Sequence, residues 1–66
     1  MTDGQNRADI TSGLEVDIIL KKDQGSGKLT RGRVQNILTS APFHSRGIKV
    51  RLMTGEVGRV AAIVRA

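Results

Sequence analysis

Basic side chains at alternating positions are the residues of this chain with the most evident chemistry. Lys49 and Arg51 alternate with three aliphatic residues in the segment 48–52, and Arg59 stands in the next alternating stretch. Because residues two apart in a strand lie on one face, Lys49 and Arg51 share a surface. Arg59 joins them in one register of the intervening turn, whereas a two-residue turn at 54–55 would place it on the opposite face.

A second group of basic residues surrounds the glycines of the segment 21–33, which holds five cations and one carboxylate. Such a loop can contact phosphate, or it can be an ordinary solvated turn. Gly27 and Lys28 resemble part of a phosphate-binding P-loop, but Leu29 stands where that motif needs Ser or Thr. A P-loop is therefore not expected.

His44 is the single imidazole of the chain and lies in the loop-like segment 39–47. It can contact a phosphate, stack on a base or act as a general base, or it can order its own loop. No second His accompanies it at ligand spacing, so we expect no metal site. No acidic residue lies between Asp23 and Glu56 to orient it, so we expect no enzyme and no cofactor.

Phosphate contact is the role that these basic residues share. Phe43 is the only aromatic residue, and we expect it to anchor the core or its loop rather than to stack on bases. Recognition should then depend on the nucleic-acid backbone or its shape, with little sequence readout. The candidate nucleic-acid-binding residues are Lys28, Arg31, Arg33, His44, Lys49, Arg51 and Arg59.

Length and charge limit the class of protein. A chain of 66 residues has room for one domain. Its net charge is +5, and the excess of positive charge lies after residue 20. The absence of cysteine excludes disulfides and thiolate metal sites and fits the cytoplasm. No apolar stretch is long enough to cross a membrane, so no membrane partner is expected.

Short alternating segments must position the candidate residues. The segments 14–20, 48–52 and 56–60 alternate apolar with polar residues or glycine, which predicts strands, and glycines at 25–27 and 55 predict turns. The segment 29–39 is expected to be a strand with a bulge or bend, or else to hold a short helix at 34–38. The tail 61–66 is expected to form a fifth strand or one helical turn.

These elements predict an all-β fold, a small SH3-like or KOW-like antiparallel barrel of four to five short strands. Residues 1–9 are expected to form a flexible N-terminal segment, and residues 10–66 the single barrel domain. Glycines at 32, 47, 55 and 58 are expected to shape turns and bulges. The predicted core consists of Val16, Ile18, Leu20, Val34, Ile48, Val50, Leu52 and Val60.

Most of the chain resembles a known family. The match rests on Gly-Leu-x-Val at 13–16, Lys-x-Asp-Gln-x-Ser-Gly-Lys-Leu-Thr-Arg-Gly at 21–32, and Gly-Ile-Lys-Val-Arg-Leu-x-x-Gly-x-Val-Gly-Arg-Val at 47–60. In these motifs the chain resembles the YwbE-like family of small uncharacterised microbial proteins, a domain of unknown function. The resemblance implies membership and no activity.

A shorter pattern, Gly13-x-x-Val16-x-Ile18 followed by Gly32-x-Val34-x-x-Ile37, is similar to KOW-type SH3-like modules of ribosomal and transcription elongation proteins. This resemblance implies contact with RNA or a ribonucleoprotein. We therefore expect a non-catalytic nucleic-acid-binding module that contacts RNA or ribosomal RNA through a basic surface. The alternative is a protein-protein interaction module that docks an acidic or edge-strand partner.

Overall fold

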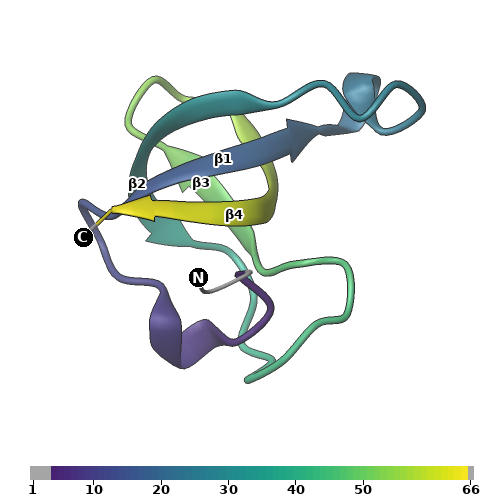
Figure 1. The fold of residues 1–66 in the computed structure, drawn as a ribbon. Coiled ribbons are helices and arrows are strands. Elements are labelled where there is room, and N and C mark those ends of the chain that lie inside the picture. The colour runs from purple at the N-terminus through teal and green to yellow at the C-terminus, as the bar shows by residue number, and fades with distance from the viewer. Residues whose placement is uncertain (1–3, 66) are drawn as a thin grey trace.

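Four antiparallel strands close into a barrel in the computed structural model, which describes residues 4–65 (Figure 1). Each strand pairs with the next in the chain, and β4 returns to pair with β1. The predicted all-β fold, a small SH3-like antiparallel barrel, is thereby confirmed. The strands are β1 (Glu15–Leu20), β2 (Thr30–Ile37), β3 (Lys49–Leu52) and β4 (Val57–Arg65), and the two 3-10 helices are η1 (Arg7–Asp9) and η2 (Lys21–Asp23).

The alternating aliphatic residues fill the barrel, as the sequence predicts. Each buried side chain contributes about 1.5–3 kcal/mol relative to an exposed one. Leu20 is only partly buried and packs against the margin of this core. Ile10 and Leu14, both ahead of β1, are buried in addition. The predicted core residues at most 1% exposed are Val16, Ile18, Val34, Ile48, Val50, Leu52 and Val60.

Two details of the strands differ from the prediction. Gly32 forms neither a turn nor a bulge, because it pairs regularly with Val16 inside β2. A Cβ at this position would lie 2.7 Å from Leu52 Cδ1, so Gly32 permits close packing across the barrel. The irregular pairing of β2 lies between Val34 and Asn36 instead.

The tail departs from the alternatives offered for it, whereas one alternative for the segment 29–39 is confirmed, because most of it forms a strand with an irregular pairing. β4 runs without interruption to Arg65, so the described part of the tail extends that strand and forms neither a fifth strand nor a helical turn. Residue 66 lies outside the described residues. The short helix considered at 34–38 is wrong, because most of that segment continues β2.

Residues 4–9 are hydrogen-bonded to the long connection between β2 and β3. The Arg7 amide donates to Pro42 O (2.9 Å), and the His44 amide donates to Gln5 O (2.9 Å). The Ile48 amide likewise donates to Gly4 O (3.0 Å). The polar composition of this segment did not predict such pairing, because the bonds involve backbone groups. Residues 1–3 lie outside the described residues.

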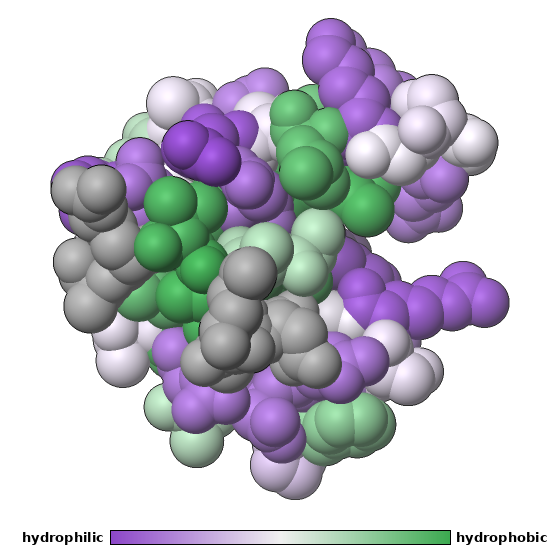
Figure 2. Space-filling view, in the orientation of Figure 1, coloured by the Kyte–Doolittle hydropathy of each residue, from purple (hydrophilic) through white to green (hydrophobic). Residues whose placement is uncertain are grey.

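The large exposed apolar residues all lie outside the strands. They are found in the turns and connections: Leu29, Leu38, Phe43 and Met53. Figure 2 shows hydrophilic side chains over much of one face, with apolar areas between them. Phe43 is 53% exposed, so the expectation that its side chain anchors the core is wrong. None of the described helices is long and apolar enough to cross a membrane.

Candidate nucleic-acid interface

The turn between β3 and β4 decides which way Arg59 points. The Leu52 amide donates to Glu56 O (2.8 Å), which leaves a three-residue loop, residues 53–55. Gly55 ends the loop with a φ of +96°, the left-handed conformation that such loops require. This register places Lys49 directly opposite Arg59. A two-residue turn would have moved Arg59 to the other face.

Three of the predicted cations therefore share one outer surface. Arg51 lies opposite Val57 in the same ladder and faces outward like Lys49, since Val50 and Leu52 face the core. Neither β3 nor β4 contains an acidic residue. The Arg59 guanidinium is half-buried, and its Nη1 donates to Gly47 O (3.2 Å), which fixes its position. The surface is thus positive by both sequence and register.

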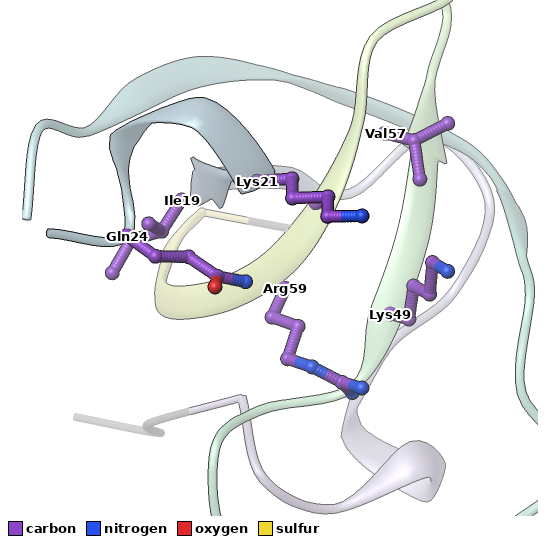
Figure 3. Close-up of a pocket in the computed structure, with 7 residues that line it drawn as sticks. Ile19, Lys21, Gln24, Lys49, Val57 and Arg59 are labelled. Carbon is purple, nitrogen blue, oxygen red and sulfur yellow. The ribbon is translucent and has the colours of Figure 1, made fainter.

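A cavity of about 410 Å³ lies against these strands and brings a fourth cation into the group. Lys21 and Gln24, from η2 and the turn after it, form a wall of the cavity together with Lys49 and Arg59. In Figure 3 the side chains of Lys21 and Arg59 extend toward β3, the strand that carries Lys49. We call the four residues Lys21, Lys49, Arg51 and Arg59 the basic face.

Arg31 is neutralised by an ion pair that no local pattern in the sequence predicts. Its Nε and Nη2 donate to the two oxygens of Asp17, at 2.9 and 3.2 Å. The hydrogen bond to Asp17 and the charge of that carboxylate raise the pKa of Arg31 above its usual range. Asp17 is 8% exposed and Arg31 largely exposed. Arg31 is therefore less available to a phosphate than the basic face is.

The other candidates on the loops and β2 stand apart from the cavity. Arg33 is exposed, lies opposite Glu15 in the ladder, and its Nη1 donates to Gly13 O (2.9 Å). Lys28 is exposed in the turn before β2, where its amide donates to Ser26 Oγ (3.4 Å). The β1–β2 surface thus carries both signs of charge, in contrast to the basic face.

His44 helps to order its own loop. Its Nδ1 accepts a hydrogen bond from the Arg46 amide (3.1 Å), and its own amide donates to Gln5 O. No group of three or more histidine and acidic residues that could hold a metal ion occurs among residues 4–65. The imidazole is half-buried, with one nitrogen in use.

Lys21 and Gln24 are the polar cavity residues that are not among the predicted site residues. In the sequence, Lys21 is one of five cations in a loop, and Gln24 has no charge that would mark it as a phosphate contact. Both reach the cavity because η2 follows β1 directly and because β1 pairs with β4. Only that long-range pairing shows that these residues approach Arg59.

The fold and this surface together define a class, a small closed antiparallel β-barrel with one strongly basic side. The chain belongs to the family described as uncharacterized conserved protein (DUF2196), whose model matches residues 3–63. It is similar to the uncharacterized protein YwbE of Bacillus subtilis (strain 168), with 59% identity over 61 residues, 92% of this chain and 94% of the relative. The predicted resemblance is thus confirmed. No solved structure matches the chain.

Proposed function

We propose that this protein is a non-catalytic RNA-binding module whose basic face contacts phosphates. The observation that carries the proposal is the cross-strand pair of Lys49 and Arg59, in strands that contain no acidic residue. Like charges directly opposite each other in a ladder destabilise a sheet by a few tenths of a kcal/mol to about 1 kcal/mol. A polyanion removes that cost when it binds.

The spacing of the basic face suits a chain of phosphates. Side chains two apart in a strand are about 7 Å apart, and neighbours across a ladder about 5 Å apart. Lys49, Arg51 and Arg59 occupy such positions and end in long flexible cations. Several successive phosphates can therefore be contacted at once. Binding should weaken as the salt concentration rises, because the release of counterions from the RNA then gains less entropy.

The shape of the described barrel favours RNA over duplex DNA. The two described helices have three residues each, too short to enter a major groove of about 12 Å width and read its bases. RNA is commonly recognised through its backbone, its 2′-hydroxyls and unpaired nucleotides, which need no protruding element. Because Nδ1 of His44 serves its own loop, we include no catalytic role in the proposal. We place the function in the cytoplasm, with RNA or a ribonucleoprotein as partner.

The test compares two double variants by fluorescence anisotropy with a labelled RNA hairpin. We expect Lys49→Gln with Arg51→Gln to weaken binding about tenfold or more and to lower the slope of log K against log salt by about 1.4–1.8. The matched control, Lys28→Gln with Arg33→Gln, removes the same charge from outside the basic face and should weaken binding much less. Urea denaturation checks that all variants fold.

Equal losses in the two double variants would contradict the proposal, because binding would then follow net charge alone. Absence of RNA binding at low salt, together with binding to a polyglutamate peptide, would favour an acidic protein partner instead. The second alternative, a partner that adds a strand to a sheet edge, meets the difficulty that the four described strands form a closed ring.

A further inference from the structure

The cavity beside the basic face contains apolar side chains, which a contact with phosphate alone would not need. One row of side chains runs across three strands, because Ile19 of β1 lies opposite Arg59 of β4, and Arg59 lies opposite Lys49 of β3. Ile19 and Val57 contribute apolar walls to the cavity, and both are half-buried. The cavity therefore combines a cationic rim with apolar surface.

Gly58 lets β1 and β4 come together behind this cavity. A Cβ on Gly58 would lie 2.5 Å from the carbonyl oxygen of Ile19 and 3.1 Å from Ile18 Cδ1. Gly58 thus permits a close approach of the two strands and does not form the expected bulge, since its pairing in both ladders is regular. Because β1 ends there and η2 turns away from the barrel, Lys21 and Gln24 form a separate wall above the strands. The hollow is built into the backbone of the fold.

The charges around the cavity select an anion. Lys21, Lys49 and Arg59 line it, and no acidic residue does. Arg59 is held in place by its bond to Gly47 O, which uses one of its five N–H donors and leaves others for a ligand. A phosphate group placed among these three cations would receive charge-assisted hydrogen bonds from three different elements.

The volume of the cavity and its other walls indicate which chemical group accompanies the phosphate. Ligand cavities in proteins hold about 300–1,000 Å³, and the 410 Å³ of this one stands near the lower limit. That volume suits one nucleotide rather than a longer piece of strand. A base would lie on the apolar surface of Ile19 and Val57. The Gln24 amide offers both a donor and an acceptor, which match the polar edge of a base.

We infer that this cavity holds one unpaired nucleotide of the bound RNA, with its phosphate among Lys21, Lys49 and Arg59 and its base against Ile19 and Val57. The inference rests on the proposed RNA binding and makes it more specific. The RNA must offer a bulged, looped or terminal nucleotide, since a base inside an uninterrupted duplex cannot leave its stack without losing its pairing.

Two RNA duplexes test the inference, one blunt and fully paired, the other identical except for a single bulged nucleotide. We expect the wild-type protein to bind the bulged duplex about five- to tenfold more tightly, the lower end of the effect of one stacked base, because the walls of the cavity are aliphatic and not aromatic. Lys21→Gln should abolish most of this preference. Lys22→Gln is the matched control, because Lys22 is exposed in the same 3-10 helix and does not line the cavity.

Gln24→Ala provides a second variant with no change of charge, and it should lower the preference for the bulged duplex. An NMR titration with a nucleoside 5′-monophosphate should shift the amides of Val57, Gly58 and Arg59 at lower concentration than inorganic phosphate does. Equal titration by the two ligands would overturn the inference, because the base would then contribute nothing.

The outcomes separate this inference from the proposed function. Equal binding of both duplexes, with Lys21→Gln and Lys22→Gln indistinguishable, overturns the cavity assignment while RNA binding by the basic face stands. Failure of both duplexes to bind at low salt overturns the proposed function itself. Binding of the free mononucleotide without any preference for the bulge also contradicts the inference, since the cavity would then serve a free nucleotide.

Discussion

Gly47 and Gly55 both have a positive φ, at +100° and +96°, yet their surroundings differ. A Cβ on Gly47 would collide with the backbone oxygen of Val60, whereas a Cβ on Gly55 would meet nothing within 4 Å. The same substitution at the two positions therefore separates backbone strain from steric collision. Gly47 also carries the oxygen that holds Arg59, so its conformation bears on the basic face.

Gly47→Ala should cost about 2–4 kcal/mol of unfolding free energy, since left-handed strain of about 1–2 kcal/mol adds to a collision with backbone. Gly55→Ala should cost about 1–2 kcal/mol from strain alone. Gly25→Ala is the control with open space and no positive φ, and it should stabilise the fold by about 0.4–1 kcal/mol, because alanine restricts the unfolded chain. Urea denaturation measures all three. Equal costs at 47 and 55 would show that the backbone near Val60 yields freely.

At the residue scale, the direction in which each cation points was only partly predictable. Lys49 and Arg51 follow from strict alternation within one strand. The face of Arg59 depends on whether the turn uses two or three residues, and only hydrogen bonds between Leu52 and Glu56 decide that. The pairing of Arg31 with Asp17 depends likewise on the β1–β2 register, in which the two residues lie opposite each other.

Among the elements, the segment 4–9 has the least expected role, because it supports the connection that carries Gly47. Its contacts join backbone groups at Gly4, Gln5 and Arg7 to the residues 42–48, and Arg7 Nε also donates to Thr39 O (3.0 Å). A Cβ on Gly4 would collide with Val60, so the segment packs closely against β4.

Deletion of residues 1–7 should loosen this connection without opening the barrel. We expect hydrogen exchange of the His44 and Ile48 amides to accelerate by at least about tenfold, because both lose their acceptors. The Val34 amide, which donates to Leu14 O, serves as an internal control and should keep most of its protection. Unchanged protection at His44 and Ile48 would contradict the structural role of the segment.

The elements themselves were predicted where a short pattern was sufficient. β1, β3 and the first part of β4 follow from alternation over four to seven residues. Ile10 belongs to no alternating stretch, so its burial could not be foreseen. The 3-10 helix η2 occupies a polar segment with no periodicity, and the sequence indicated only a loop there.

For the whole molecule, the positive charge gathered on one side favours the binding of an anion and lowers the stability of the folded state. The chain carries +5 in total, and Lys49 and Arg59 face each other directly. Such repulsion extends over about 30 Å at 0.01 M salt and about 8 Å at 0.15 M. The folded state should therefore be less stable at low salt than at moderate salt.

Raising NaCl from about 0.01 M to about 0.15 M should increase the unfolding free energy by about 0.5 kcal/mol. Lys49→Gln should raise the low-salt stability by about 0.2–1 kcal/mol and reduce the salt effect. Lys28→Gln, which makes the same change in net charge, should do neither to the same extent. Urea denaturation at the two salt concentrations gives the comparison. Identical behaviour of the two variants would mean that the cross-strand pair carries no repulsion.

At this scale the fold class was predictable and the cavity was not. An all-β barrel follows from several short strands separated by glycine turns in so short a chain. The cavity needs Lys21 and Gln24 to approach β4, which they do only through the pairing of the first strand with the last. No local pattern in a sequence encodes a contact of that range.

The pairing of β1 with β4 also determines the stage of synthesis at which the cavity can form. Residues 1–56 include β1, β2 and β3, but they lack Val57, Gly58 and Arg59, which complete the cavity. Contacts between distant segments form slowly compared with local ones. A nascent chain therefore acquires the nucleotide site only after β4 has been made and has reached β1. An RNA that occupies the site would hold the ring shut and slow its reopening.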